Sequence, residues 1–406
     1  MPTEITLLLG LEGPNLYMPQ PGVLLRVVSD KDRSRRLKDA LKDGAQSIGM
    51  VLGYLDVAAR PAAAGYQIDA SFSTPTPALG IALARYVVEG LNRREAGDDA
   101  WDADGPLWEL QKRRRAEALP LEALQLIAEA SSRGIPSFTR ADGQVQLGYG
   151  ARGWSFEPAR FAKRPERASL LGDDEIAIGP PLFASPPAAL EVPWERLGPI
   201  PIVALAGADA ARDIAARTVA AELDTHGRPT GLALAADYDA TRELLANPAA
   251  TIAVAALSAG GIAARGLAIE RCAYSAVVDL PADLPAGIAD SAELARVLGV
   301  PMLITDPAGR VALNADVPEI AALAEYAPCP IIFISTAEAD NPTIGFHRAQ
   351  GGQALFVRGG TVIAAQGAAE HAVLAATLPP TELPGALAAL ALLWAMGLSW
   401  QQIRGE

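Results

Sequence analysis

The chain has 406 residues, of which 50% are hydrophobic and 20% charged, a composition typical of globular proteins and unlike that of disordered ones. Its 47 acidic residues outnumber 34 Lys and Arg and give a net charge of −13, which argues against nucleic acids and anionic membranes as partners. Two cysteines, Cys272 and Cys329, are too few for a disulfide framework and indicate a reducing compartment.

Neither end of the sequence has the pattern of an export or membrane segment. The first five residues contain no basic cluster, and Gly10 and Pro14 interrupt the apolar run that follows, so we expect no signal peptide. The apolar stretch Leu383–Trp400 contains Pro384 and Gly397 and falls short of the roughly 20 strongly apolar residues that span a bilayer. We expect a buried helix there, and a soluble, cytoplasmic protein without membrane contacts.

Residues 1–160 mix strand and helix patterns, which favours an α+β domain. Alternating or apolar runs predict strands at Ile5–Leu9, Val23–Val28, Tyr66–Phe72 and Val145–Leu147. Helical spacing predicts helices at Ser34–Asp43, Ser47–Ala59, Ala78–Arg94 and Leu121–Ser131.

Residues 161–198 are rich in proline and read as a linker. Residues 199–406 then alternate short apolar runs with helical stretches, the pattern of a doubly wound parallel sheet. The predicted strands are Ile202–Leu205, Leu232–Ala235, Ile252–Ala256, Ala276–Leu280, Pro301–Ile304 and Ile331–Ile334. A helix is predicted at Ala211–Leu223, and a terminal hairpin around Gly359-Gly360.

Several short motifs, in their order along the chain, resemble cyanophycin synthetases and, in the second half, the Mur ligase superfamily. In the first half they are Gly13-Pro14-Asn15 and the run Val145–Gly150. In the second half they are Gly260-Gly261-Ile262, Arg265-Gly266-Leu267, Arg271-Cys272, Leu313-Asn314-Ala315-Asp316, Asn341-Pro342 and His347-Arg348-Ala349. The resemblance implies an N-terminal α+β domain followed by a Mur-ligase-like central domain with a P-loop, Rossmann-like parallel sheet.

Two domains of that family have no counterpart in the sequence. The family places an ATP-grasp domain where residues 161–198 stand, and continues into a Mur C-terminal domain beyond the position of Arg404. We therefore expect the chain to consist of the N-terminal domain joined by the Pro-rich linker to the Mur-like central domain.

The segment that matches the family's P-loop has lost most of the residues that hold a nucleotide. A P-loop cradles phosphates with backbone N–H groups, a lysine and a magnesium-binding hydroxyl. The matching positions are Gly207, Ala208, Asp209, Ala210, Ala211, Arg212 and Asp213. By this resemblance the lysine falls on Ala211 and the hydroxyl on Arg212 or Asp213. Arg212 lies one residue late for a phosphate cation and has a different geometry, so we predict a degenerate P-loop that binds no cofactor.

At the other positions that bind magnesium or act in catalysis in the family, this chain also lacks the required residue. The resemblance puts the family's magnesium-binding Glu at Ala256. Where the family has a loop with a His, this chain has Asp279–Asp283. The family's carbamylated lysine has no counterpart, because no Lys follows Lys163. The three histidines, His226, His347 and His371, all lie in the second half, so a zinc site in the N-terminal domain has no His ligand. We expect no catalytic and no metal-binding residue.

The remaining polar features have simpler interpretations. His226 precedes a glycine and is typical of a helix C-cap, while His347 is expected to make structural hydrogen bonds. The run Lys112–Arg115 fits a solvated helix face, with contact to an acidic partner as the alternative.

These observations predict a catalytically inactive homologue that acts as a structural or regulatory subunit, either as a homo-oligomer or with an active cyanophycin-synthetase-like ligase. The alternative is an ATP-dependent amide ligase with a nucleotide site rearranged around Arg212, Asp209 and Asp213. A third hypothesis, suggested by the acidic composition, is a module that binds arginine-bearing peptide.

Overall fold

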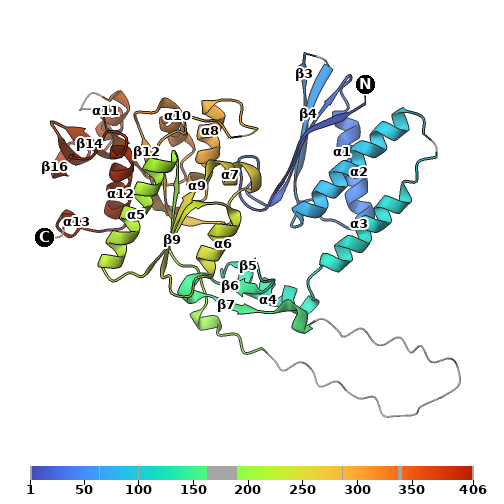
Figure 1. The fold of residues 1–406 in the computed structure, drawn as a ribbon, viewed down its shortest axis with the longest axis horizontal. Coiled ribbons are helices and arrows are strands. Elements are labelled where there is room, and N and C mark those ends of the chain that lie inside the picture. Colours follow the sequence, from blue (N-terminus) through green and yellow to red (C-terminus); the bar gives the residue numbers. More distant parts are fainter. Residues whose placement is uncertain are drawn as a thin grey trace, which may run out of the picture.

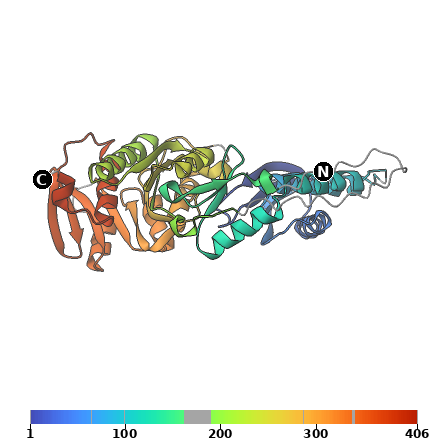
Figure 2. The ribbon, with the colours of Figure 1, turned by 90° about the horizontal axis from the view of Figure 1, so that it is seen from below.

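The computed structural model describes residues 2–63, 65–98, 100–161, 190–285, 287–336 and 341–404. The molecule is elongated, with an N-terminal lobe at one end and a large sheet at the other (Figures 1 and 2). Most of the predicted linker, residues 162–189, lies outside the described residues. The domain boundaries at 160 and 199 therefore stay a prediction.

The N-terminal lobe is built on a four-stranded antiparallel sheet in the order β1-β2-β4-β3. Its strands are β1 (Glu4–Leu11), β2 (Gly22–Ser29), β3 (Leu55–Ala62) and β4 (Gly65–Ser73). Helices α1 (Ser34–Ile48) and α2 (Pro77–Glu95) lie over one face, and α3 (Asp104–Glu117) packs on both helices (Figure 1). Alternate residues of β2, such as Val23 and Leu25, are fully buried against these helices, as the pleat of a half-buried strand requires.

The predicted helix Ser47–Ala59 is wrong. Helix α1 ends at Ile48 because Gly49 follows in the left-handed conformation (φ +67°), which returns the chain and closes the last turn. The rest of the predicted helix is a loop and then β3, whose residues alternate between half-buried and exposed positions.

A smaller unit follows and rests on the second half of the chain. It comprises α4 (Leu121–Ser132) and the antiparallel strands β5 (Ser137–Thr139), β6 (Val145–Leu147) and β7 (Trp154–Phe156), with 3₁₀ turns η1 (Gly150–Arg152), η2 (Pro158–Phe161) and η3 (Trp194–Arg196). The Gln146 amide donates a hydrogen bond to the carbonyl of Leu245 (3.1 Å), and Tyr149 belongs to the core of the large sheet. This unit is therefore packed against residues about 100 positions further along the chain.

The large sheet has nine strands in the order β16-β15-β14-β13-β12-β11-β8-β10-β9. Seven are parallel: β8 (Ile202–Ala206), β9 (Thr230–Ala236), β10 (Ile252–Leu257), β11 (Cys272–Val277), β12 (Thr305–Asn314), β13 (Ile331–Ser335) and β14 (Gln353–Arg358). Two antiparallel strands, β15 (Thr361–Gln366) and β16 (Ala369–Ala375), close one edge. The hairpin predicted at Gly359-Gly360 joins β14 to β15, and both glycines have positive φ.

Helices cover both faces of this sheet, which confirms the predicted α/β fold class. One hydrophobic core joins α5 (Asp209–Thr225) and α12 (Leu383–Ala395) to the sheet, and α13 (Trp400–Arg404) packs at its margin. The other core receives α6 (Tyr238–Ala246), α7 (Ala259–Arg265), α8 (Ser291–Leu298), α9 (Val300–Leu303), α10 (Pro318–Ala321), η4 (Ala322–Tyr326) and α11 (Pro342–Ala349).

Two sequence predictions in this half need comment. The predicted strand Pro301–Ile304 is wrong: Pro301 occupies the first turn of α9, a position that suits its fixed φ, and the strand begins only at Thr305. The apolar stretch Leu383–Trp400 does contain a buried helix, α12, which ends at Ala395. Within the described residues, no helix is both long and apolar enough to cross a membrane.

Candidate functional site

Strand β8 is the point in the large sheet at which the order of the parallel strands reverses. From β8 the chain first builds β9 and β10 on one side and then β11, β12 and β13 on the other. In open α/β sheets, ligands bind in the crevice beside such a reversal, outside the carboxyl ends of the strands. The loop between β8 and α5 lies at this point, so the fold puts the segment 207–213 where a phosphate-binding loop belongs.

The backbone of this loop is bonded to the loop that follows β11. The Ala208 N–H donates a hydrogen bond to the carbonyl of Asp279 (3.1 Å). Gly207 has φ +143°, and a Cβ at that position would lie 2.9 Å from the same carbonyl oxygen. Only glycine suits this conformation and spacing, and one N–H of the potential phosphate cradle is already committed to the protein.

Arg212 is the largest fully buried side chain in the described part of the structure, with an exposure of 0%. Its Nη1 lies 2.8 Å from Asp209 Oδ1 and donates to the carbonyl of Leu257 (3.2 Å). Its Nε and Nη2 both donate to Asp213 Oδ1, at 2.9 and 2.8 Å. The guanidinium thus points back into the protein and ties the start of α5 to the end of β10.

The charges around Arg212 do not favour an anion. One guanidinium faces two carboxylates, and these differ in exposure, 86% for Asp209 and 28% for Asp213. A triphosphate approaching the loop would meet the exposed carboxylate before any cation, which is repulsive unless a metal ion intervenes.

Helix α12 packs directly on the first turn of α5. A Cβ on Gly385 would lie 2.3 Å from the carbonyl oxygen of Ala211, so the two helix backbones are in contact there. Ala211, the position that the resemblance assigns to the P-loop lysine, is 2% exposed. A long cationic side chain at this position would have to displace α12.

A second polar cluster joins the loops after β12 and β13. The Asp316 carboxylate accepts hydrogen bonds from Ser335 Oγ (2.5 Å), from the N–H and hydroxyl of Thr336 (2.7 and 2.9 Å) and from Asn341 Nδ2 (3.1 Å). The structure therefore brings together two of the motifs named from the sequence, Leu313–Asp316 and Asn341-Pro342. Every one of these contacts is internal, so the cluster braces two loops.

The three histidines are spread over separate elements. His226 is the C-cap of α5, and its Nδ1 lies 2.8 Å from the carbonyl of Glu222, in agreement with the expected capping role. His347 Nε2 lies 3.2 Å from the carbonyl of Ile331, and its ring packs edge-on against Phe333. His371 is on β16. Over the described ranges, no group of three or more His, Cys, Asp or Glu is placed to hold a metal ion.

The two cysteines are buried free thiols. Burial raises the pKa of the Cys272 thiol to about 12 and that of Cys329 to about 11. Both therefore stay protonated at neutral pH, which makes a nucleophilic thiolate unavailable.

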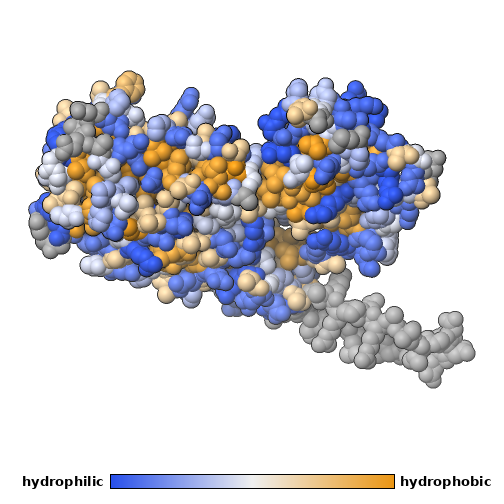
Figure 3. All heavy atoms as spheres, turned by 45° about the horizontal axis from the view of Figure 1, so that its top comes forward, coloured by the Kyte–Doolittle hydropathy of each residue, from blue (hydrophilic) through white to orange (hydrophobic). Residues whose placement is uncertain are grey.

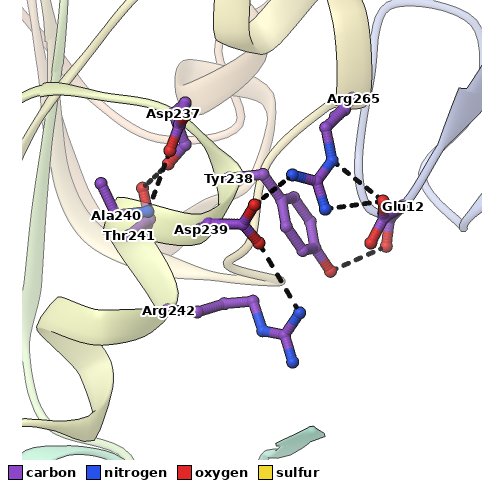
Figure 4. A network of polar contacts seen from close by, with 8 residues as sticks. All are labelled: Glu12, Asp237, Tyr238, Asp239, Ala240, Thr241, Arg242 and Arg265. Atoms are coloured by element: carbon purple, nitrogen blue, oxygen red, sulfur yellow. Dashed lines mark hydrogen bonds and ion pairs between the residues drawn. The ribbon is translucent and has the colours of Figure 1, made fainter. Parts of the chain in front are cut away.

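A polar joint connects the two lobes, and sequence analysis did not foresee it (Figure 4). The turn Gly13-Pro14-Asn15 docks on Arg265-Gly266-Leu267 through two backbone hydrogen bonds: Glu12 N–H to the Arg265 carbonyl (2.7 Å) and Leu267 N–H to the Pro14 carbonyl (2.8 Å). A Cβ on Gly13 would lie 1.9 Å from the Leu267 carbonyl oxygen. Two motifs some 250 residues apart therefore form one contact.

Charged side chains complete the joint. Arg265 donates from Nε to Glu12 Oε1 (2.9 Å), and its Nη1 binds the Asp239 carboxylate (Figure 4). Its guanidinium also lies over the Tyr238 ring, 4.7 Å from the centroid, and the Tyr238 hydroxyl donates to the Glu12 carbonyl (3.2 Å). Burial, followed by the nearby Glu12 carboxylate, raises the pKa of Tyr238. Hydrophobic side chains also gather where the lobes face each other (Figure 3).

Residues 2–334 match a protein family described as a domain of unknown function, DUF4938, and the chain belongs to that family. It is 33% identical over 171 residues to cyanophycin synthetase of Synechocystis sp., and 29% identical over 171 residues to that of Crocosphaera subtropica. Each alignment covers 40% of this chain and 20% of the relative, so the chain spans about a fifth of the length of these curated relatives.

Two solved structures that match part of the chain are named as ligases. One is UDP-N-acetylmuramate:L-alanyl-gamma-D-glutamyl-meso-diaminopimelate ligase of Neisseria meningitides, at 12% identity and a TM-score of 0.36 over 50% of this chain and 64% of that one. Another is UDP-N-acetylmuramoyl-L-alanyl-D-glutamate–2,6-diaminopimelate ligase, at 14% identity and a TM-score of 0.40 over 52% and 46%.

Proposed function

We propose that this protein is a non-catalytic homologue of cyanophycin synthetase that acts as a structural or regulatory subunit. Its Mur-like half keeps the parallel sheet and the loop at its reversal point, but in this proposal the loop no longer binds a nucleotide. We expect it to work in the cytoplasm, bound either to another copy of itself or to an active cyanophycin-synthetase-like ligase.

The observation that carries this proposal is the position of Arg212. A guanidinium that served a phosphate would project into the crevice, whereas this one is 0% exposed and paired with Asp209, Asp213 and a carbonyl on β10. Its hydrogen bonds are satisfied without a ligand. Opening them to admit an anion would cost free energy, because it would take a fully buried guanidinium away from its partners.

The alternative function is an ATP-dependent amide ligase with a rearranged nucleotide site, since the curated relatives are synthetases. The observation that favours it is the side chain of Asp209, which pairs with Arg212 through Oδ1 but is 86% exposed at the start of α5, so that its carboxylate is accessible to a magnesium ion that bridges to phosphate. In that case Arg212 would hold Asp209 and Asp213 in place for the metal.

Titration of the full chain with Mg-ATP by isothermal calorimetry separates these functions. The proposal predicts no binding tighter than about 100 μM, which corresponds to roughly −5.5 kcal/mol. An active cyanophycin synthetase measured in the same buffer is the positive control. Tight binding of Mg-ATP to this chain would overturn the proposal, and formation of an amide product by the purified chain alone would establish the ligase.

The subunit role needs its own measurement. We expect the chain to co-purify with a co-expressed cyanophycin synthetase, or to elute as an oligomer, and to change the synthetase's rate or thermal stability in the former case. A chain that elutes as a monomer, forms no complex with the synthetase and leaves its activity unchanged has neither of the proposed roles.

A further inference from the structure

A cavity of about 790 Å³ lies at the end of the large sheet opposite to the crevice described above. Its walls come from the segments that precede β8 and β11, from the start of β12, and from the small unit that contains α4 and β6. This volume is within the range of about 300–1,000 Å³ that small-molecule sites occupy. No residue of the loop 207–213 lines it, so it is a separate place on the molecule.

The cavity exists because β8 and β11 separate at their amino ends. Pairing between these strands begins only at Val203 and Tyr274. The residues before β8 include Pro199 and Pro201, which have no N–H to offer a neighbouring strand. The gap is thus built into the sequence and does not depend on a mobile loop.

A buried tyrosine reaches this cavity without a partner. Tyr149 lines the cavity and is 5% exposed, and no hydrogen bond joins its hydroxyl to any residue that the structure describes. A buried phenol ordinarily finds a partner. Burial, followed by the Glu270 carboxylate, raises the pKa of Tyr149, so its hydroxyl stays protonated and presents lone pairs as an acceptor.

The charged groups of the lining leave one carboxylate unpaired. Arg271 forms an ion pair with Asp306 (3.5 Å), and Arg152 donates to the carbonyls of Leu197 and Pro199 (3.3 and 3.4 Å). No ion pair or hydrogen bond connects the Glu270 carboxylate to the rest of the described chain. Tyr274 adds an aromatic ring to the same wall.

From these contacts we propose that the cavity binds an organic cation, an aliphatic amine whose ammonium group meets Glu270 and the Tyr149 hydroxyl while its carbon chain lies on the apolar wall formed by Ile135, Ile200 and Ile202. Carboxylate, phenol oxygen and aromatic face are the groups that stabilise an ammonium ion. Two arginines and two carboxylates line the cavity itself, whereas residues 190–406 as a whole carry an excess of negative charge, with 23 Asp and Glu against 12 Arg and no Lys. This site is independent of the function proposed above.

The test uses the full chain and 1,4-diaminobutane, followed by isothermal calorimetry. We expect saturable binding with a dissociation constant of about 1 mM or lower. The uncharged analogue 1,4-butanediol has nearly the same shape and should bind at least tenfold more weakly, because it cannot pair with a carboxylate.

Two variants locate the binding. Glu270→Gln keeps the shape and should weaken binding of the diamine severalfold, the size expected for an ion pair at an exposed carboxylate. Tyr149→Phe should also weaken it severalfold. Glu243→Gln removes an exposed carboxylate of α6 outside the cavity and should leave the affinity unchanged. Absence of binding by the wild type, equal affinity for diamine and diol, or an equal effect of Glu243→Gln and Glu270→Gln would each overturn the proposal.

Discussion

Replacing Arg212 with Met tests whether this side chain is a structural tie between α5 and β10. Methionine fills a similar space but leaves Asp209, Asp213 and the Leu257 carbonyl without their cation. Removing one partner of a fully buried ion pair costs about 3–5 kcal/mol. Here the abandoned carboxylates are 86% and 28% exposed and partly regain water, which lowers the expected loss to about 2–3 kcal/mol.

The assay is urea unfolding together with a thermal scan. A loss of that size lowers the melting temperature by about 5–10 °C for a domain of this size. Arg217→Met is the matched control, because Arg217 is exposed on the same helix and its replacement should change stability by less than about 0.5 kcal/mol.

The outcome also bears on the nucleotide question. If Arg212→Met is as stable as Arg217→Met, the buried cluster is not a structural tie and the reasoning above is wrong. If Mg-ATP raises the melting temperature of the wild type but not of Arg212→Met, the guanidinium serves a nucleotide, since a ligand stabilises only the state that binds it.

Three further predictions concern other parts of the molecule. Gly13→Ala places a Cβ 1.9 Å from the Leu267 carbonyl oxygen across the lobe joint. It should lower the free energy of unfolding by about 1–3 kcal/mol and increase the radius of gyration measured by solution scattering. The control Gly260→Ala, which has open space around the added Cβ, should change neither quantity. Burial raises the pKa values of the Cys272 and Cys329 thiols to about 12 and about 11, so both should resist a thiol reagent at pH 8 until the chain unfolds. Their contribution to stability should be lost as the pH rises above about 8.5, where the thiols of the unfolded chain ionise. Glu370, whose pKa the Arg358 guanidinium lowers to about 2, should contribute stability above about pH 4.3 that is lost as the pH falls toward 2, and Glu370→Gln should abolish this dependence in urea midpoints.

Hydrophobic patterning was sufficient to predict most of the sheet strands, because buried parallel strands have short apolar runs with glycine or proline at their ends. Hydrophobic patterning gave the wrong element where the same short apolar run fits either a helix or a strand. The run at 301–304 is apolar and short, and its proline suits a helix start better than a strand. The stretch 47–59 contains a helix end, a loop and a strand, and a window of that length averages over all three.

The candidate site was predictable in position but not in its contacts. The glycine after an apolar strand marks a loop at residue 207, and the fold puts that loop at the reversal of strand order. The direction of the Arg212 side chain could not be read from the sequence, since its carbonyl partner Leu257 is 45 residues away at the end of β10. The lobe joint escaped detection for the same reason, because Gly13 and Leu267 become neighbours only through the tertiary fold.

The motifs that resemble cyanophycin synthetase and the positions at which this chain lacks a residue expected from that family lie in different kinds of contact. Two pairs of the shared motifs are in contact across the fold: the turn at Gly13 lies against the backbone of Leu267, and the Asn341 side chain donates to the Asp316 carboxylate. By the resemblance, the departures are expected at side chains that would carry charge to a nucleotide, and at this place the Arg212 guanidinium pairs with Asp209 and Asp213. The proposed subunit role would need these contacts between segments but no charge directed at a nucleotide. Substitution is therefore most informative at Arg212 and Gly13, because the first tests the proposed lack of nucleotide binding and the second tests the contact between the lobes.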